Sequence, residues 1–196
     1  MVVVMLFFLV ASAEAALIDR GGGFIYDDVQ DITWAQDANI NGVDTWANQV
    51  AWAAGYSQTH SVYGTFDDWR LPTTLQPDAS CSDQSGGVSS GLDCTGSEMG
   101  HLFNVDGISS SSAHPFLYAP SGYYWSGTVY APVPSAAWFD GILTAGWQGY
   151  APKTQLLNAL AVRDGDIAPI PEPSAAVLLG LGLSGLAASG RRRNRS

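Results

Sequence analysis

The chain has 196 residues, of which 46% are hydrophobic and 13% are charged, and its formal net charge at pH 7 is −10. This length suits one ordinary domain with a substantial core. The 18 acidic residues, set against eight basic ones, predict a surface that repels nucleic acid and sulfated polysaccharide and attracts cations. No nucleic-acid partner is expected.

The first residues predict a cleavable export signal. Val2 to Val10 is almost wholly apolar, and small residues follow up to Ala16. This is an h-region with a small-x-small cleavage site, so residues 1–15 are interpreted as a signal peptide that is cut after Ala15 or Ala16. The basic n-region of such signals is missing here, because the first 19 residues contain no Lys or Arg. The alternative is a buried N-terminal strand.

The segments that follow predict two strands, a short apolar stretch and a helix. Residues 17–20 and 24–27 flank three glycines, which is typical of a strand, a turn and a strand, and the apolar stretch is 32–34. A helix is expected over 46–54, because several apolar residues share one face at helical spacing. Asp44 or Thr45 would cap it and Gly55 would end it; the shared face consists of Trp46, Val50, Ala53 and Ala54.

The middle of the chain predicts loops and one short helix. Residues 56–66 are expected to be a loop, 67–73 a short extended segment ended by proline, and 76–96 and 106–114 polar loops rich in Ser and Gly. Thr95 and Glu98 have the spacing of a capping box, in which Glu98 reaches back to Thr95. A short helix would start there and carry Met99, Leu102 and Phe103.

Cys81 and Cys94 are the only two cysteines. In an oxidising compartment this pair predicts a disulfide, which contributes about 3 kcal/mol by closing a loop of this size. The alternative is a redox or metal pair. The spacing is too wide for a C-x-x-C motif, and the chain has no further cysteine to complete a zinc site.

Four short runs near the C-terminus predict an antiparallel sheet. They are separated by Gly and Pro and cover residues 123–128, 136–140, 146–150 and 157–163. Helices first and strands later indicate a single α+β domain, with one main helix, one short helix and a C-terminal antiparallel sheet.

The C-terminal tail carries a processing pattern. Pro171-Glu172-Pro173 is followed by an uncharged apolar segment at 174–190 and by four arginines at the end. Residues 169–196 resemble the PEP-CTERM sorting signal of exported bacterial proteins. The resemblance implies export through the secretion translocon, transient membrane insertion, cleavage near Pro171–Pro173 by an exosortase-type membrane protease, and delivery to the cell surface or outside. The apolar segment is short for a span, since a straight helix needs about 20 residues.

A permanent anchor that is never cut is the alternative interpretation of this tail. Cleavage at both ends leaves four basic and 16 acidic residues, hence a net charge of −12.

A second resemblance covers residues 16–168. Four motifs occur in the order of a bacterial domain family that is named for the C-terminal domain of the Legionella collagen-like adhesin: Trp69-Arg70-Leu71-Pro72-Thr73, Gly96-Ser97-Glu98-Met99, Tyr124-Trp125-Ser126-Gly127-Thr128 and Ala161-Val162-Arg163. The layout is also remotely similar to the C-type-lectin-like fold. The resemblance implies a non-enzymatic adhesin domain associated with glycosaminoglycans and biofilm. Because this chain is acidic, a neutral glycan, a cation-bridged polymer or a matrix protein is the expected ligand.

One loop has the spacing that opens a calcium site. Asp37, Asn39, Asn41 and Asp44 lie in a D-x-N-x-N-G pattern, in which oxygens at alternate positions converge on a hard cation. The twelfth position is Asn48, which offers no bidentate carboxylate. The alternative is an Asx-rich turn that caps the helix. Asp27, Asp28 and Asp31 are a weaker candidate for a cation, and no other cofactor is expected.

The aromatic residues are numerous, with seven tryptophans. Most are expected in the core. Trp147, flanked by Gly146 and Gln148, is the best candidate for an exposed sugar platform, and Tyr150 and Tyr124 are the residues that would line a cleft with it. Arg70 and Arg163 are expected to pair with a carboxylate or to stack on an aromatic ring. The histidines, His60, His101 and His114, have no ligand spacing.

These observations predict an exported, non-enzymatic protein of the cell surface or extracellular matrix, which takes part in adhesion or in biofilm or exopolysaccharide binding. One alternative is a purely structural matrix protein without a defined ligand. Another is a polysaccharide-active enzyme, in which Asp67 or Asp68 would act together with Glu98. Such an enzyme needs two carboxyl groups about 5 to 9.5 Å apart in a cleft.

Overall fold

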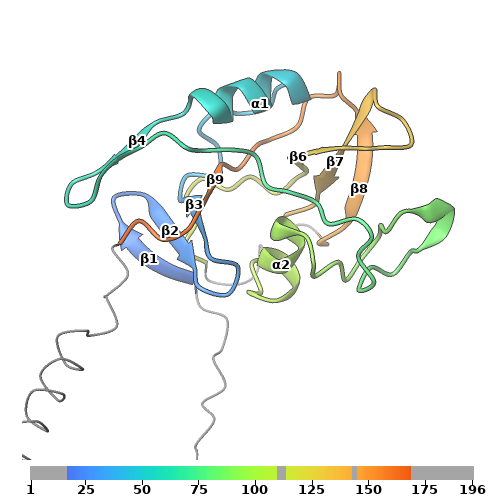
Figure 1. Cartoon of the computed structure of the whole chain (residues 1–196), viewed down its shortest axis with the longest axis horizontal. Coiled ribbons are helices and arrows are strands. Elements are labelled where there is room, and N and C mark those ends of the chain that lie inside the picture. Colours follow the sequence, from blue (N-terminus) through green and yellow to red (C-terminus); the bar gives the residue numbers. More distant parts are fainter. Residues whose placement is uncertain (1–16, 110–113, 143–144, 169–196) are drawn as a thin grey trace, which may run out of the picture.

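The computed structural model describes residues 17–109, 114–142 and 145–168, which form two antiparallel sheets, a hairpin and two α-helices. Figure 1 shows α1 along the top of the molecule, the sheet that contains β1 to β3 on the left and the sheet of β6 to β8 on the right. This arrangement confirms a mixed α+β fold in a single domain. The likeness to C-type lectins stays a prediction, and the predicted signal peptide and tail segment lie outside the described residues.

The first sheet is built from both ends of the described chain. It has the order β1 (Leu17–Gly21), β2 (Phe24–Asp27), β3 (Ile32–Ala35) and β9 (Val162–Asp164), and all neighbours are antiparallel. The predicted strand, glycine turn and strand are confirmed. Gly22 and Gly23 both have positive φ, a conformation that glycine adopts without steric cost.

The second sheet consists of β6 (Tyr124–Val129), β7 (Ala136–Asp140) and β8 (Gln148–Pro152), in that order. The prediction that residues 157–163 form its fourth strand is wrong. Residues 157–161 make isolated backbone bonds to both halves of the molecule, for example from the Leu157 N–H to Asp44 and from the Trp125 N–H to Asn158. Only Val162–Asp164 forms a strand, and it pairs with β3. The run is apolar because it is buried between the two sheets.

Helix α1 (Trp46–Gly55) has the predicted place and length. Trp46, Val50 and Ala53 pack against the core that includes Leu71 and Trp125. Ala54, which was expected on the same face, is exposed.

The polar start of α1 holds it to the rest of the domain. Thr45 is the N-cap but makes no side-chain cap bond, whereas Asp44 accepts hydrogen bonds from the Thr45 N–H and the Asn48 amide. Gln49 is fully buried and donates to the carbonyls of Gly42 and Leu157.

The segment after α1 is not the loop that was expected. Strands β4 (Gln58–His60) and β5 (Gly64–Phe66) form a hairpin, which projects at the left end of Figure 1. Its strands have three residues each and are mostly polar, so they lack the alternation that identifies a half-buried strand.

Helix α2 (Glu98–Asn104) starts later than its capping-box motif predicted. Ser97 is the N-cap and makes no side-chain cap bond to the helix. Thr95 does not cap the helix, and Glu98 instead accepts hydrogen bonds from the Thr73 N–H and from Arg70. A long-range ion pair therefore takes the place of the local box. The loop before α2 contains a single 3₁₀ turn, η1 (Ser85–Gly87).

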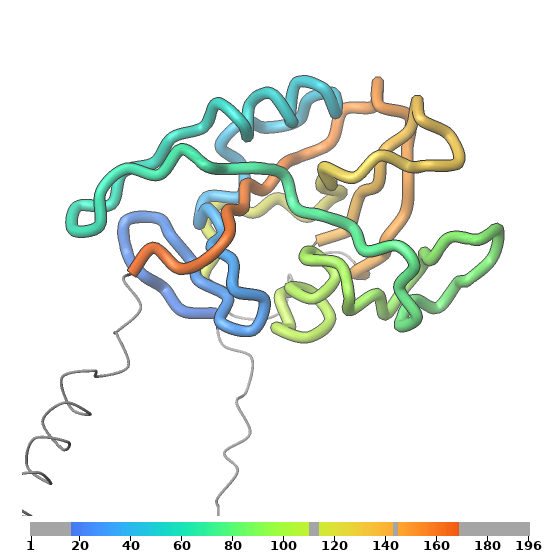
Figure 2. The backbone as a smooth tube through the Cα atoms, viewed as in Figure 1, coloured from blue at the N-terminus to red at the C-terminus, as the bar shows by residue number. Residues whose placement is uncertain are grey.

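The tryptophans are mainly core residues, as expected, with Trp34, Trp125 and Trp138 almost wholly buried. The first and last described residues both lie on the lower-left side of the molecule in Figure 2. Arg20 and Asp166 form an ion pair there.

Candidate functional site

The disulfide loop lies beside the second sheet. Cys81 and Cys94 are bonded, as predicted, and Gly91 forms a two-way backbone bridge with Gln148 of β8. The buried Gln148 side chain accepts from the Ser97 hydroxyl at 2.5 Å and donates to the Ser89 carbonyl at 3.0 Å. A buried polar group that is bonded in this way holds its neighbours in one arrangement. The loop is therefore fixed against β8.

A groove runs between this loop and the residues before β8. Its two aromatic side chains, Trp147 and Tyr123, are 42% and 41% exposed. Their ring centroids are 6.4 Å apart, and both rings contact Phe139. We call this feature the Trp147 groove. It is lined by Ser82, Asp83, Ser90, Gly91, Leu92, Tyr123, Ala145 and Trp147.

A glycine makes room for the indole. A Cβ added at Gly149 would come within 2.9 Å of the Trp147 ring and 3.0 Å of the Phe139 ring, closer than side chains pack. The outer edge of the indole therefore lies close to the backbone of β8 at Gly149. One wall of the groove is aromatic and the other presents hydroxyls and the carboxylate of Asp83. Hydrogen bonds lower the pKa of Asp83 below its usual value, and the bond from the Ser85 N–H has the largest effect.

The other two predicted platform residues do not join Trp147. Tyr150 is exposed but stacks on Tyr130, with ring centroids 3.8 Å apart, next to Trp138. Tyr124 is fully buried, where its hydroxyl donates to the Pro120 carbonyl. The prediction of Tyr124 as a platform is therefore wrong. Its neighbour Tyr123, which directly precedes β6, lines the groove instead.

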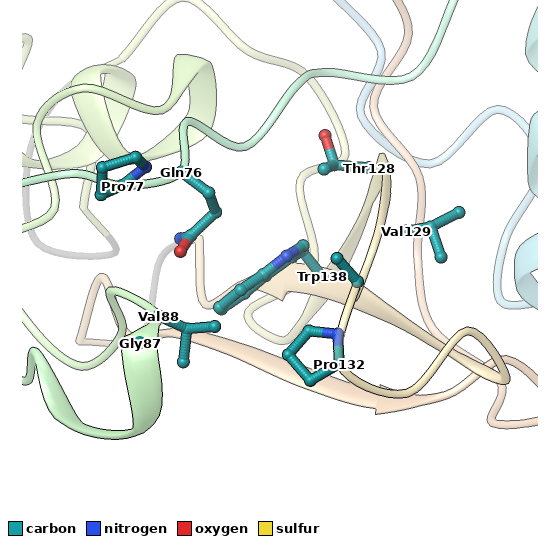
Figure 3. A pocket seen from close by; sticks show the side chains of 9 residues that line it. Gln76, Pro77, Gly87, Val88, Thr128, Val129, Pro132 and Trp138 are labelled. Carbon is teal, nitrogen blue, oxygen red and sulfur yellow. The ribbon is translucent and has the colours of Figure 1, made fainter.

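A second hollow, of about 340 Å³, opens on the sheet near Trp138. Figure 3 shows the Trp138 ring in the middle, with Gln76 on one side and Val88 and Pro132 on the other. This lining is mostly apolar. The Gln76 amide is already used, because it donates to the Ser89 carbonyl and accepts from the Ser89 N–H. The hollow thus offers few free polar groups for a hydrophilic ligand.

The Trp69-to-Thr73 motif has a structural role in this fold. Leu71 is buried, and the Pro72 carbonyl accepts from the Gly127 N–H and the Ser126 hydroxyl. The carboxylate pairing expected for both arginines is present. Arg70 binds Glu98 and Asp164, and Arg163 binds Asp68 and lies over the Phe66 ring, at 4.7 Å.

The same ion pairs occupy Asp68 and Glu98, two of the three carboxylates that were considered for catalysis. Asp68 accepts two hydrogen bonds from Arg163, at 2.8 and 2.9 Å, and this interaction lowers the pKa of Asp68. Glu98 accepts two from Arg70. A general acid needs a raised pKa, whereas the pKa of Asp68 is lowered.

The hydrogen bonds within the predicted calcium loop are those of an Asx-rich turn, which was the alternative interpretation of this segment. The Asp37 carboxylate accepts from the Asn39 N–H at 2.9 Å. The Asn41 amide donates to the Gln49 side chain, and the Asp44 carboxylate accepts from the Thr45 N–H and the Asn48 amide at the start of α1. Calcium binding by Asp37, Asn39, Asn41 and Asp44 stays a prediction.

A different cluster of ligand-type side chains was missed by sequence reasoning. One ligand atom each from Asp27, His101 and Asp106 lies within 4.8 Å of the others. Burial, together with the charges of Asp27 and Asp28, raises the pKa of Asp106 to about 7. Because these residues come from segments far apart in the chain, no local spacing could reveal them.

Comparison with known families identifies the tail. Residues 169–193 match the PEP-CTERM protein-sorting motif, which confirms the predicted sorting signal. The class of protein is thereby fixed: it is an exported protein that is sorted by an exosortase-type membrane enzyme and reaches the cell surface or the outside. The tail residues Pro171, Glu172 and Pro173 lie within the matched segment. These three residues and Ala15 of the predicted signal peptide lie outside the described residues.

No curated protein and no solved structure matches the chain. In residues 17–109, 114–142 and 145–168, no helix has the length and the apolar composition to cross a membrane. The predicted span at 174–190 lies outside these residues.

Proposed function

We propose that this exported protein is a non-enzymatic component of the cell surface or extracellular matrix and binds an uncharged glycan chain through the Trp147 groove. Its role would be adhesion or association with biofilm exopolysaccharide. The observation that carries the proposal is the exposed Trp147 ring, next to Tyr123 and opposite the hydroxyls of Ser82 and Ser90.

The chemistry of the groove suits a sugar ring. A sugar has an apolar C–H face and a rim of hydroxyls, and Trp and Tyr combine an apolar ring with a polar atom. Specific sites for such ligands place a few polar groups around an apolar surface. Here Asp83, kept ionised by its lowered pKa, accepts hydrogen bonds from sugar hydroxyls.

The charge of the protein narrows the ligand class. With 16 acidic and four basic residues left after cleavage at both ends, the surface repels sulfated and uronic-acid polymers. A neutral glycan is therefore favoured over a glycosaminoglycan. A binding role is also what the resemblance to the Legionella adhesin domain family, drawn from sequence motifs alone, implies. The pairing of Asp68 and Glu98 with arginines speaks against catalysis.

The proposal is tested by affinity electrophoresis through gels that contain neutral polysaccharides, with Trp147→Ala and Tyr63→Ala as variants. Tyr63 is 40% exposed, like Trp147, but lies in the β4–β5 turn. We expect a neutral polysaccharide to retard the wild type and the Tyr63 variant and not the Trp147 variant. Equal retardation of all three proteins would refute glycan binding in the Trp147 groove. If no polysaccharide retards the wild type, the alternative of a purely structural matrix protein is favoured. If the wild type releases reducing ends from a polysaccharide, the alternative of a polysaccharide-active enzyme is favoured.

Calcium binding at the Asp37 loop is a separate proposal. A ligand that binds only the folded state raises the midpoint of thermal unfolding. The midpoint should rise with calcium and fall back with chelator in the wild type, and should not respond to calcium in Asp37→Ala. An equal response in both proteins would remove this loop from consideration.

A further inference from the structure

We propose that Asp27, His101 and Asp106 bind one divalent transition-metal ion of the zinc class. We call these three residues the Asp27–His101–Asp106 cluster. The site is separate from the Trp147 groove and does not depend on the proposed glycan binding. Its function would be to link the end of β2 to α2 with one ion.

The fold brings the three side chains together from two regions. Asp27 is the last residue of β2, His101 lies in α2, and Asp106 follows the end of α2. One ligand atom of each lies within 4.8 Å of the other two. Metal–ligand bonds to nitrogen and oxygen are roughly 2.0–2.2 Å long, so ligands on one ion are about 3 to 4 Å apart. Small side-chain movements bring this group to that spacing.

Asp106 supplies an independent reason for a ligand at this place. Its side chain is only 2% exposed, and neither carboxylate oxygen has a hydrogen-bond partner. The Nε2 atom of His101 has no partner either. The two side chains face each other with 4.0 Å between His101 Nε2 and Asp106 Oδ1, which is too long for a direct hydrogen bond. Buried polar atoms are rarely left unpaired, and a shared ion would satisfy both.

Asp27 is held in position by its own turn. Its Oδ1 accepts from the Val29 and Gln30 N–H groups, and its Oδ2 accepts from the Gln30 amide at 2.6 Å. Gln30 also donates to the Glu98 carbonyl at the start of α2. Carboxylates that bind metal ions are commonly oriented by such outer hydrogen bonds. Each oxygen retains lone-pair capacity for an ion, because a carboxylate has about four acceptor sites.

The ligand set selects the class of ion. Imidazole nitrogen suits zinc, copper, iron and nickel ions better than calcium, which takes oxygen ligands. Two carboxylates and a neutral imidazole carry a charge of −2, which a divalent ion balances. Three protein ligands leave a coordination position that a water molecule would fill. The chemical competitor is a proton on His101, which would turn the pair with Asp106 into an ion pair.

The other group of three ligand-type residues in the described part of the chain does not compete for such an ion. It consists of Asp78, Cys81 and Cys94. Its two sulfurs are bonded to each other, and Asp78 accepts hydrogen bonds from Ser80 and from the Gly96 N–H. All of its ligand atoms are therefore used within the loop.

The test uses the full chain with its disulfide formed, purified in mild detergent, stripped with chelator and dialysed. Equilibrium dialysis against zinc chloride should give one ion per chain, and the same experiment with calcium chloride should give none at this cluster. Asp106→Asn keeps the shape of the side chain and should weaken zinc binding by at least about tenfold, the order of loss seen even for outer-shell partners. His101→Gln should do the same.

Asp140→Asn is the matched control. Asp140 is another buried carboxylate, and burial raises its pKa to about 7, but it lies outside the cluster. It should bind zinc like the wild type. With cobalt chloride, the wild type and the control should show visible ligand-field absorption that Asp106→Asn lacks.

Two results would overturn the proposal. One is zinc binding that is equal in the wild type and in Asp106→Asn, or absent from both. The other is an unfolding midpoint that responds to pH but not to zinc, which would assign the pair of His101 and Asp106 to a proton. The unfolding midpoint of each variant without metal shows that it is folded. Asp106→Asn should be at least as stable as the wild type, because it removes an unpaired buried carboxylate.

Discussion

Arg70 and Glu98 form an ion pair with two parallel hydrogen bonds, of 2.8 and 2.7 Å. The pair ties the extended segment before Pro72 to the first residue of α2. Glu98 also accepts from the Thr73 N–H at 2.7 Å, and Arg70 also binds Asp164 of β9. The hydrogen bonds to Glu98 and Asp164 raise the pKa of Arg70 above its usual value, and those to Glu98 have the larger effect. Three segments therefore meet at one guanidinium.

Glu98→Gln should lower the free energy of unfolding by about 2 kcal/mol, a value between those of exposed and buried ion pairs. The amide cannot form the same charged fork, and the partly buried Arg70 loses a counterion. Urea unfolding followed by tryptophan fluorescence measures the change. Asp68→Asn is the control, because Asp68 is 54% exposed in its pair with Arg163 and should lose less than about 1 kcal/mol. Equal losses would show that burial does not set the strength of these pairs.

Gly100→Ala tests how closely α2 approaches the disulfide loop. A Cβ at Gly100 would lie 2.0 Å from the Cys94 carbonyl oxygen, so the backbone of the loop or helix must move. We expect a loss of about 3 kcal/mol or more, at the upper end for overpacking. The same change at Gly55, where a Cβ would meet nothing within 4 Å, should be neutral or stabilise by up to about 1 kcal/mol. Chemical denaturation of both variants makes the comparison, and similar values would contradict the close approach.

Local patterns predicted the elements whose partners are near in sequence. Three glycines with strand-type flanks gave β1 and β2, and apolar spacing gave α1. The disulfide followed from having only two cysteines in an exported chain. In each case a short stretch of sequence or a simple count contains the determining feature. These features are the backbone freedom of glycine, one apolar face of a helix and a single possible pairing of cysteines.

Features that depend on tertiary partners could not be predicted in this way. Glu98 fits a capping box equally well, and only the approach of Arg70 shows why it turns away from Thr95. Tyr123 and Tyr124 are chemically equal in the sequence, yet Tyr124, the first residue of β6, is buried in the core and Tyr123 before it is exposed. The Asp27–His101–Asp106 cluster needs β2 and α2 side by side. These are consequences of packing, which periodicity does not record.

The buried carboxyl of Asp140 should make stability depend on pH. Burial raises its pKa to about 7 in the folded state, against an unfolded value of 3.8. The protonated form is favoured on folding, so this stability is fully present below pH 3.8 and is lost as the pH rises through about 7.

Asp140→Asn stays neutral at every pH and should escape this loss. Its advantage over the wild type should grow from near zero at about pH 4 to an upper limit of about 4 kcal/mol at about pH 8. Urea unfolding of both proteins at several pH values between these limits measures it. A difference that does not change with pH would mean that Asp140 is charged in the folded state throughout.

The boundary between the domain and its sorting signal can be located by truncation. Ile167 is buried against the core that contains Phe24 and Trp69, and Asp166 pairs with Arg20 of β1. The matched sorting motif begins at residue 169. A chain that ends after Ala168 should therefore keep the stability of the full chain. One that ends after Gly165 should lose about 2 to 3 kcal/mol, the value of burying one large aliphatic side chain, plus the ion pair.

The two truncated chains differ by three residues, so their comparison isolates Asp166, Ile167 and Ala168 from the tail. Chemical denaturation in the same mild detergent measures both against the full chain. If the chain ending after Ala168 were destabilised as much as the shorter one, the sorting segment would itself contribute to the fold. Equal stability of that chain and the full chain would mean that an exosortase-type enzyme can remove the tail without loosening the domain. Ile167, the last buried residue in the described part of the chain, precedes the start of the motif by two positions.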